Sequence, residues 1–230
     1  MKVIKDFTDL YLELCNKPRA GWVARQVKQP ETVWQHTERV TFLSEEYAPQ
    51  YLGKKSVFHC KMLGLSHDLP EGIMHDITPH DRVTKKQKQD LEFLVIDHIG
   101  MMPYKEGDIF NGAVMREYFL EYEAQETPAA KFVGKIDKLQ MGVEALNIEL
   151  TNRCAYSLQP FWDYIEKHLQ DSPLMEVFVN LKTRRPASAY LKPEIAVPPK
   201  PPGFFEQIQQ EVLIKMGRLP IPKEYPTLRR

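Results

Sequence analysis

The chain of 230 residues has few cysteines, no long apolar run and no net charge. Its three cysteines are odd in number and widely separated, which excludes a disulfide framework and favours a reducing compartment. No segment is apolar over the roughly 18 residues that a membrane-spanning helix needs. The first residues, MKVIKDFTDLYLELC, carry acidic groups among the apolar ones and do not match a signal peptide. We therefore expect a cytoplasmic protein that does not insert into a membrane.

Charge and proline are unevenly distributed along the chain. The 31 basic residues balance the 31 acidic ones, which argues against binding to a nucleic-acid polymer. Residues 183–230 carry nine basic and four acidic residues, and residues 186–230 hold nine of the 18 prolines. Such a composition favours extended backbone. We expect a domain at 1–182 and a proline-rich, mostly irregular tail at 183–230 with one short helix, Phe204–Met216. Two interpretations of this tail remain: a linker that lies along the surface of the domain, or a docking peptide for an unknown partner.

Apolar residues recur at helical spacing through most of residues 1–182, and no segment alternates in the manner of a strand. Thr127 and Ser172 each precede a proline, which is typical of a helix start. The pattern predicts an all-α protein. The expected helices are Phe7–Asn16, Thr32–Ala48, Val57–Leu69, Thr84–Ile99, Ile109–Ala124, Pro128–Glu149, Pro160–Leu169 and Pro173–Lys182.

The segment HDLPEGIMHDITPHD, residues 67–81, contains His-Asp three times. The first pair, His67-Asp68, ends a predicted helix, and His67 continues an apolar stripe at steps of three and four residues. Glu71 follows His67 by four residues and is expected on the same face. The other two pairs, His75-Asp76 and His80-Asp81, follow Gly72 or a proline and are expected in loops. Burying a histidine between two carboxylates is costly without a cation, so the first pair is the strongest candidate for a metal site.

Two other predicted helices also carry a polar residue on their apolar face. His36 interrupts one such stripe and Asp137 interrupts another, although acidic residues are rarely buried unless they are paired or metal-bound. Three inward-facing polar groups suggest one shared centre. A mixed set of imidazole and carboxylate ligands suits Mn, Fe, Co, Ni or Zn better than Ca or Mg. The alternative is three unrelated core residues, each satisfied by its own hydrogen bonds.

These residues lie in segments that resemble the HD-domain phosphohydrolases, and more narrowly the HD-domain 5′-deoxynucleotidases. The matching segments occur in the family's order and spacing. They are RAGWVARQV at 19–27, PETVWQH at 30–36, HDLPEGIMHDITP at 67–79, EYEAQETPAAKFVGKIDKLQM at 121–141 and EAL at 144–146. A single His-Asp dipeptide would carry little weight, whereas this ordered set is specific.

The resemblance implies an all-α, HD-domain helical bundle that forms homodimers. It implies a hydrolase, a phosphatase of nucleotide metabolism, that removes phosphate from (deoxy)nucleoside 5′-monophosphates by attack of a metal-bound water. One divalent transition metal ion would be held by four residues, with Co or Mn favoured in assays. The implied metal ligands are His36, His67, Asp68 and Asp137; Glu71 is implied as the catalytic carboxylate, and Arg19, Trp22 and Asp76 as substrate contacts.

The implied roles agree with elementary phosphate chemistry. A divalent ion lowers the pKa of bound water towards ~7 and neutralises a phosphoryl oxygen. Glu71 could act on that water or on the leaving 5′-oxygen as a general base or acid. Arg19, or alternatively Arg25, offers a bidentate clamp for phosphate. Trp22 is either a wall that crowds a 2′-hydroxyl or an ordinary packing aromatic.

The sequence departs from the family at His75, which stands where a glycine is usual, and nothing after residue 182 matches the family core. Other reactions of HD domains also stay open. A dNTP triphosphohydrolase needs a more basic pocket, and a (p)ppGpp hydrolase has a Glu-Asp pair where Glu71 precedes Gly72. Other phosphodiesterases add histidines for a second metal, for which His75 and His80 are available. The alternative that is not an enzyme is a metal-binding scaffold protein that acts through its tail.

Overall fold

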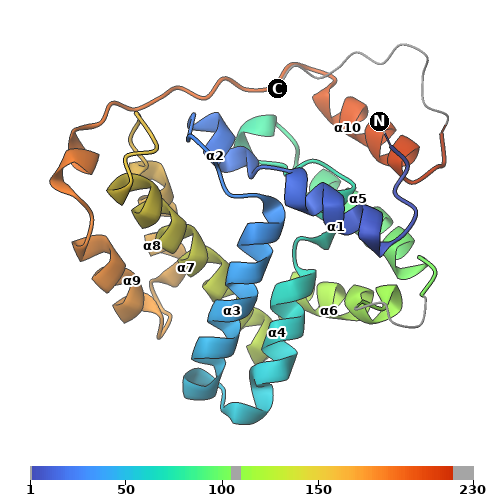
Figure 1. Ribbon diagram of the computed structural model, residues 1–230, viewed down its shortest axis with the longest axis horizontal. Helices are drawn as coiled ribbons and strands as arrows, with labels where there is room; N and C mark the ends of the chain where they lie inside the picture. The colour runs from blue at the N-terminus through green and yellow to red at the C-terminus, as the bar shows by residue number, and fades with distance from the viewer. Residues whose placement is uncertain (1, 105–109, 220–230) are drawn as a thin grey trace.

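A computed structural model describes residues 2–104 and 110–219. This part of the chain contains ten α-helices and several short 3-10 helices but no named strand, so the predicted all-α class is confirmed. The predicted first residue of one helix, Ile109, and the tail beyond residue 219 lie outside the described residues. The helices are α1 (Phe7–Asn16), α2 (Ala20–Ala24), α3 (Val33–Tyr51), α4 (Val57–Ser66), α5 (Lys85–Gly100), α6 (Gly112–Ala124), α7 (Pro128–Leu150), α8 (Gln159–Leu169), α9 (Met175–Thr183) and α10 (Phe204–Lys215) (Figure 1).

Several helices begin where a side chain caps the free backbone N–H groups of the first turn. The Thr32 hydroxyl accepts from the Gln35 N–H, and the Gln35 side chain accepts from the Thr32 N–H in return. Thr127 caps α7 directly before Pro128, as predicted. The expected start at Pro173 is wrong by two residues. The N–H of Met175 bonds to the Ser172 carbonyl, so residues 172–174 form a turn and α9 begins at Met175.

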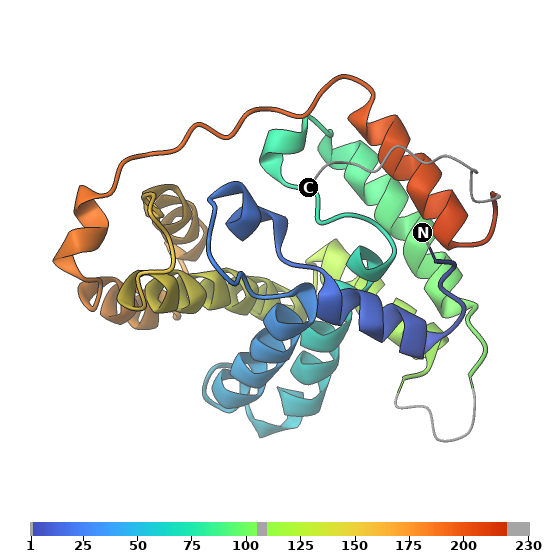
Figure 2. The same cartoon turned by 45° about the horizontal axis from the view of Figure 1, so that its top comes forward.

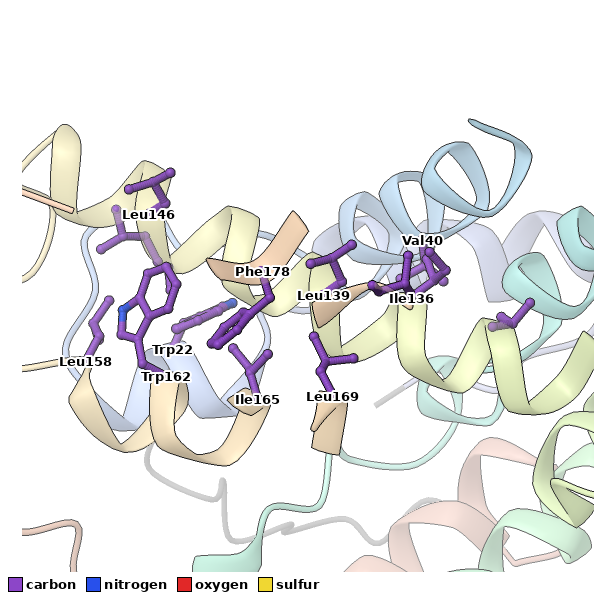
Figure 3. Close-up of a cluster of buried hydrophobic side chains, with 14 of the residues drawn as sticks. Trp22, Val40, Ile136, Leu139, Leu146, Leu158, Trp162, Ile165, Leu169 and Phe178 are labelled. Carbon is purple, nitrogen blue, oxygen red and sulfur yellow. The ribbon is translucent and has the colours of Figure 1, made fainter. Parts of the chain in front are cut away.

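Two apolar clusters hold the helices together. The first gathers α3, α4 and most of the length of α7 with α8 and α9, and Figure 3 shows Trp162, Ile165 and Phe178 packed against α7. Phe178 is fully buried, which contributes about 1.5–3 kcal/mol relative to an exposed side chain. The second cluster joins α1, α5, α6 and α10 through buried residues such as Leu10 and Ile208. Residues from α3 and from the segment after α4 contribute to this second cluster as well, and the candidate site lies near the same elements.

Two further expectations from the sequence concern the cysteines and membrane insertion. All three cysteines are free: Cys60 and Cys154 are buried, and Cys15 is half-buried. Among the described residues no helix combines the length and the apolar character that crossing a membrane requires.

The segment after α9 is attached to the helical body at both ends. Arg185 donates two hydrogen bonds to the Glu149 carboxylate, at 2.8 and 2.9 Å, and lies over the ring of Trp162. Residues 192–203 then run without regular structure, and Figures 1 and 2 show this stretch passing from the α9 side of the molecule to α10. The predicted short helix at Phe204–Met216 is confirmed as α10. The domain boundary at residue 182 stays a prediction.

Candidate metal centre

The first His-Asp pair lies at a break between two kinds of helix. The expected helix Val57–Leu69 ends earlier, because α4 stops at Ser66 and a 3-10 helix occupies Leu69–Gly72. Pro70 has no N–H to donate to the Ser66 carbonyl, so the α-helical hydrogen bonds cannot continue. Gly72 is required there, since a Cβ atom would lie 2.4 Å from the Leu10 side chain. This tight turn brings His67, Asp68 and Glu71 toward one side of the molecule.

Four of the predicted site residues converge. The Nε2 atom of His36 lies 3.2 Å from His67 Nε2, 3.1 Å from Asp137 Oδ1 and 3.6 Å from Asp68 Oδ2. The distance from His67 Nε2 to Asp68 Oδ2 is 3.3 Å. Ligand bonds of about 2.1 Å separate neighbouring donors by about 3.0 Å in an octahedron and about 3.4 Å in a tetrahedron. The spacing therefore fits donors that surround one divalent ion, and a His36, His67 and Asp68 group meets the geometric requirement for such a site.

The state of the His67 ring also fits metal ligation. Its Nδ1 lies 2.7 Å from the Gly64 carbonyl oxygen, which can only accept, so Nδ1 carries the proton and Nε2 presents a lone pair. Burial lowers the pKa of His67, but the neighbouring Asp68 carboxylate outweighs it and raises the pKa above its ordinary value, so a metal ion at Nε2 would take the place of a proton that the same carboxylate favours. A lone pair facing carboxylates and a second imidazole in a buried site favours a bound cation.

The two carboxylates of the group are held ionised by different cations. Burial opposes ionisation of Asp137, but Lys138 at 2.6 Å and the His36 ring hold its pKa well below the ordinary range. The Tyr122 hydroxyl donates to the same Oδ2 atom, at 3.2 Å, which leaves Oδ1 directed at His36. Burial likewise raises the pKa of Asp68, and His67 and Arg19 more than reverse the effect. Both groups thus carry the charge that a metal ligand requires.

A cavity of about 680 Å³ opens beside these residues, and Glu71 lies in its wall. Glu71 is buried, and its Oε2 atom has no hydrogen-bond partner among the described residues. Burial raises the pKa of Glu71 well above the ordinary value, and the nearby charges of Asp68 and Asp76 raise it further. A buried carboxyl with a raised pKa and a free oxygen can exchange a proton with a molecule in the cavity.

Arg19 and Asp76 lie next to each other on the cavity wall. Arg19 NH1 donates to Asp68 Oδ2 at 2.6 Å, and Asp76 Oδ2 accepts from the backbone N–H of Ala20 at 2.7 Å. Burial opposes the charge of Arg19, but Asp68 and Asp76 raise its pKa above the ordinary value. Arg25 also lines the cavity, but its NH1 is directed at the Ile195 carbonyl, at 3.4 Å. The geometry thus links Arg19, rather than Arg25, to the converging group.

Trp22 lies in the same wall and is 2 % exposed. Its ring stacks on Phe161, with centroids 4.3 Å apart, and its Nε1 donates to Glu31 Oε1 at 3.0 Å. These contacts fix the orientation of the indole. Both roles considered for Trp22 are compatible with this position, because it packs in the first cluster and faces the cavity as well.

Several polar residues around the cavity were not singled out from the sequence. Lys88 forms an ion pair with Glu92 at 2.9 Å, and burial raises the pKa of Glu92 to about 7. A Lys and a Glu four residues apart commonly form an ion pair on the surface of a helix, so nothing in the sequence distinguished this pair as part of a site. Glu31 and Gln140 were missed as well. The only available signal was their nearness in sequence to a proposed ligand, since Glu31 lies five residues before His36 and Gln140 lies three residues after Asp137.

The other two His-Asp pairs do not join the converging group. His75 Nε2 lies 2.6 Å from Glu211 Oε2 on α10, so this histidine contacts the tail. His80 is exposed at the edge of the cavity, and Asp81 caps its own turn by accepting from the Thr78 N–H at 2.5 Å. In the described part of the chain neither histidine belongs to a group spaced for a second metal.

Comparisons with known proteins agree with this geometry. A family model described as an HD domain matches residues 13–176. The chain is 32 % identical to 5'-deoxynucleotidase hdd1 of Schizosaccharomyces pombe over 64 % of its own length and 72 % of that protein. It is also 32 % identical to 5'-deoxynucleotidase HDDC2 of Danio rerio over 78 % of its length and 86 % of the relative. The crystal structure of the PH0347 protein from Pyrococcus horikoshii OT3 covers 75 % of this chain and 96 % of its own, with a TM-score of 0.58 at 24 % identity, which is a likeness of fold.

Proposed function

Because the chain belongs to the HD-domain family, we propose that it is a metal-dependent phosphohydrolase that removes phosphate from deoxynucleoside 5′-monophosphates. The relatives named 5'-deoxynucleotidases support this substrate class. The observation that carries the proposal is the convergence of His36, His67, Asp68 and Asp137 beside a cavity whose wall contains the unpartnered carboxyl oxygen of Glu71.

The four converging residues would hold one divalent transition metal ion. Their two imidazole nitrogens and two carboxylate oxygens suit Mn, Fe, Co, Ni or Zn. When bound, such an ion supplies an acidified water and neutralises charge on a phosphoryl oxygen. Lys138 and Tyr122 keep the Asp137 carboxylate ionised and oriented for this task.

Glu71 acts as the group that moves a proton. Burial raises its pKa, so Oε2 holds a proton to a higher pH than the carboxyl of an exposed glutamate would. From the cavity wall this carboxyl can donate to the leaving 5′-oxygen of the nucleoside, or accept a proton from the attacking water. The absence of a protein partner for Oε2 leaves the atom available to the substrate.

Arg19 and Asp76 orient the substrate. Arg19 stands 2.6 Å from Asp68, so its remaining N–H groups can reach phosphate oxygens next to the metal ligands. Asp76 accepts a hydrogen bond from the Ala20 N–H, and its carboxylate can accept a further one from a hydroxyl of the sugar. Lys88 adds a further positive charge to the same cavity.

Trp22 sets the wall for the sugar. Its ring is fixed by Phe161 and Glu31, so it cannot swing away to admit a bulkier group. We propose that this rigid wall disfavours the 2′-hydroxyl of ribonucleotides. The steric difference of one hydroxyl supports a preference of about 10–200-fold rather than absolute selection.

Related activities make different demands on the same cavity. A triphosphate would place two further charged groups in a space whose wall includes Asp76, Glu92 and Glu123. Basic residues such as Arg25, Lys85 and Lys88 line the same wall, so the names of the relatives, rather than the charge of the wall, favour a monophosphate. The homodimer and the cytoplasmic location stay predictions.

Phosphate release from purified protein tests the proposal. The protein is stripped with chelator, reloaded with Co²⁺ or Mn²⁺, and assayed against deoxynucleoside and ribonucleoside monophosphates and against deoxynucleoside triphosphates. We expect phosphate from the deoxynucleoside monophosphates and loss of turnover in Glu71→Gln. Phosphate or triphosphate release from triphosphates alone would replace the proposal with a triphosphohydrolase, and metal binding without any hydrolysis would replace it with a scaffold.

A further inference from the structure

The His36 ring contacts a fully buried amide on its side away from the converging group. His36 Nδ1 lies 2.6 Å from Gln140 Oε1, and the exposed fraction of both residues is 0 %. The other end of the amide, Gln140 Nε2, donates to Glu31 Oε2 at 3.0 Å. The amide therefore bridges an imidazole and a carboxylate, and no solvent is available to replace either partner.

The Glu31 carboxylate determines which way this amide points. Glu31 accepts from three donors: Trp22 Nε1 at 3.0 Å, Arg39 NH1 at 2.6 Å and Gln140 Nε2. A carboxylate accepting from all of these has no proton to give. If the amide were reversed, its oxygen would face the Glu31 oxygen and the buried carboxylate would lose one of its donors, which is unfavourable in a buried site. The amide oxygen is therefore held toward His36.

The amide in turn determines the tautomer of His36. A carbonyl oxygen can only accept, so the proton of the neutral ring lies on Nδ1 and is donated to Gln140. Nε2 then presents its lone pair at the point where His67 Nε2, Asp137 Oδ1 and Asp68 Oδ2 meet. His67 reaches the same state through the Gly64 carbonyl, but His36 has no backbone acceptor in this role.

From these contacts we propose that Gln140 and Glu31 are positioning residues, which keep His36 in the Nδ1–H tautomer that a metal ligand through Nε2 requires. The proposal rests on the proposed metal site but not on the reaction. Arg39 also donates to Glu144 at 2.8 Å, and Arg153 donates to the second Glu144 oxygen at 2.8 Å, so the Glu31 carboxylate is itself held by a larger ion-pair network.

The tautomer is measured directly in metal-free protein. Long-range ¹H–¹⁵N correlation spectra of histidine rings distinguish an Nδ1–H ring from an Nε2–H ring, and the His36 signal is assigned from its absence in His36→Gln. We expect a proton on Nδ1 in the wild-type protein, whether or not Nε2 beside Asp137 is protonated as well, and loss of the Nδ1 proton in Gln140→Met, whose side chain has a similar size but no strong acceptor. A wild-type His36 ring without a proton on Nδ1 would overturn the proposal, whether or not the protein hydrolyses nucleotides.

Metal affinity provides the second measurement. By calorimetry with Mn²⁺ or Co²⁺, Gln140→Met should bind about 10–100-fold more weakly, the usual effect of removing the partner of a histidine ligand. Thr37→Val is the matched control, since Thr37 is buried next to His36 on α3 and its hydroxyl has no partner among the described residues. This control should bind metal like the wild type. Equal affinity of wild type and Gln140→Met would overturn the proposal.

Discussion

The imidazole of His75 lies 2.6 Å from the carboxylate of Glu211, although 136 positions separate them in the chain. His75 directly precedes Asp76, whose carboxylate accepts from the N–H of Ala20 in the wall of the cavity. The ring of Phe204 on the same α10 helix lies near His75, with centroids 6.5 Å apart. The tail thus contacts the loop that contains a proposed substrate contact, at the residue where the sequence departs from the family pattern.

We expect Glu211→Ala to weaken substrate binding with little effect on the chemical step. The change removes the anchor of the 75–78 loop, so Asp76 would be held less firmly. A partly exposed ion pair is worth up to about 1 kcal/mol, which corresponds to a rise in KM of about three- to fivefold. Steady-state kinetics with a deoxynucleoside monophosphate measure KM and kcat separately.

Glu206→Ala is the control for this prediction. Glu206 lies on the same helix but is exposed. It should leave KM unchanged, as should any change to α10 that spares the loop. If Glu211→Ala also left KM unchanged, the contact between tail and loop would have no part in substrate binding.

The Glu71 carboxyl predicts a pH-dependent cost to stability. Its pKa is raised by burial, so the folded protein holds the proton more tightly than the unfolded chain, whose ordinary value is 4.5. Below about pH 4.5 both states are protonated and Glu71 costs nothing. As the pH rises from there toward the folded pKa, the unfolded chain loses its proton first, and wild-type stability falls.

Glu71→Gln removes this cost because an amide does not titrate. In metal-free protein we expect the variant to melt at a higher temperature than the wild type at pH 7–8, by roughly 2–4 °C for each kcal/mol regained. The difference should vanish near pH 4. Thermal melts across this pH range, in the presence of chelator, measure it. A constant difference at every pH would mean that Glu71 is not buried as an acid with a raised pKa.

Metal ligation and proton transfer should separate in two single variants. Asp137→Ala removes a donor whose Oδ1 lies 3.1 Å from His36 Nε2, and we expect metal affinity to fall by at least about 100-fold. Glu71→Ala should keep metal affinity within a few fold while losing most of the turnover. Calorimetry on chelator-stripped protein and phosphate release measure the two effects.

Asp163→Ala is the matched control, because Asp163 is an exposed aspartate on the neighbouring helix α8. It should bind metal and turn over substrate like the wild type. Unchanged metal affinity in Asp137→Ala would remove Asp137 from the ligand set, and near-normal turnover in Glu71→Ala would remove the proposed catalytic group.

The periodic pattern of the sequence predicted the long helices because each buries one apolar face. It missed α2, whose five residues are too few to show a period, although α2 positions Trp22. It placed Glu71 one α-helical turn after His67, whereas Pro70 converts that turn to a 3-10 helix. Glu71 still lies in the cavity wall, so the expected neighbourhood was right and the expected local geometry was wrong.

The residues around the converging group were harder to foresee than the group itself. His36 and Asp137 stood out because a polar residue on an apolar stripe needs an explanation. Glu31 and Gln140 are 109 positions apart, and their contact depends on how α3 and α7 pack. No local pattern encodes such a pair. The resemblance to a family supplied the order of the segments but did not assign the hydrogen bonds between them.

The attachment of the tail yields the last prediction. Arg185, three residues past the predicted domain boundary, has a fully buried side chain and lies between the rings of Trp162 and Tyr190, 4.6 and 4.4 Å from their centroids. Arg185→Met would leave the Glu149 carboxylate buried without its cation, retaining only the bond from Trp162 Nε1. Breaking a buried ion pair in this way costs about 3–5 kcal/mol.

Urea unfolding should show this loss of stability in Arg185→Met. Arg184→Met, at the exposed neighbouring arginine, is the control and should change the free energy of unfolding by less than about 0.5 kcal/mol. A large difference between the two variants would mean that residues beyond 182 belong to the folding unit, because an ion pair inside the first cluster would then contribute to its stability. Equal stability would mean that the helical body ends where the composition changes.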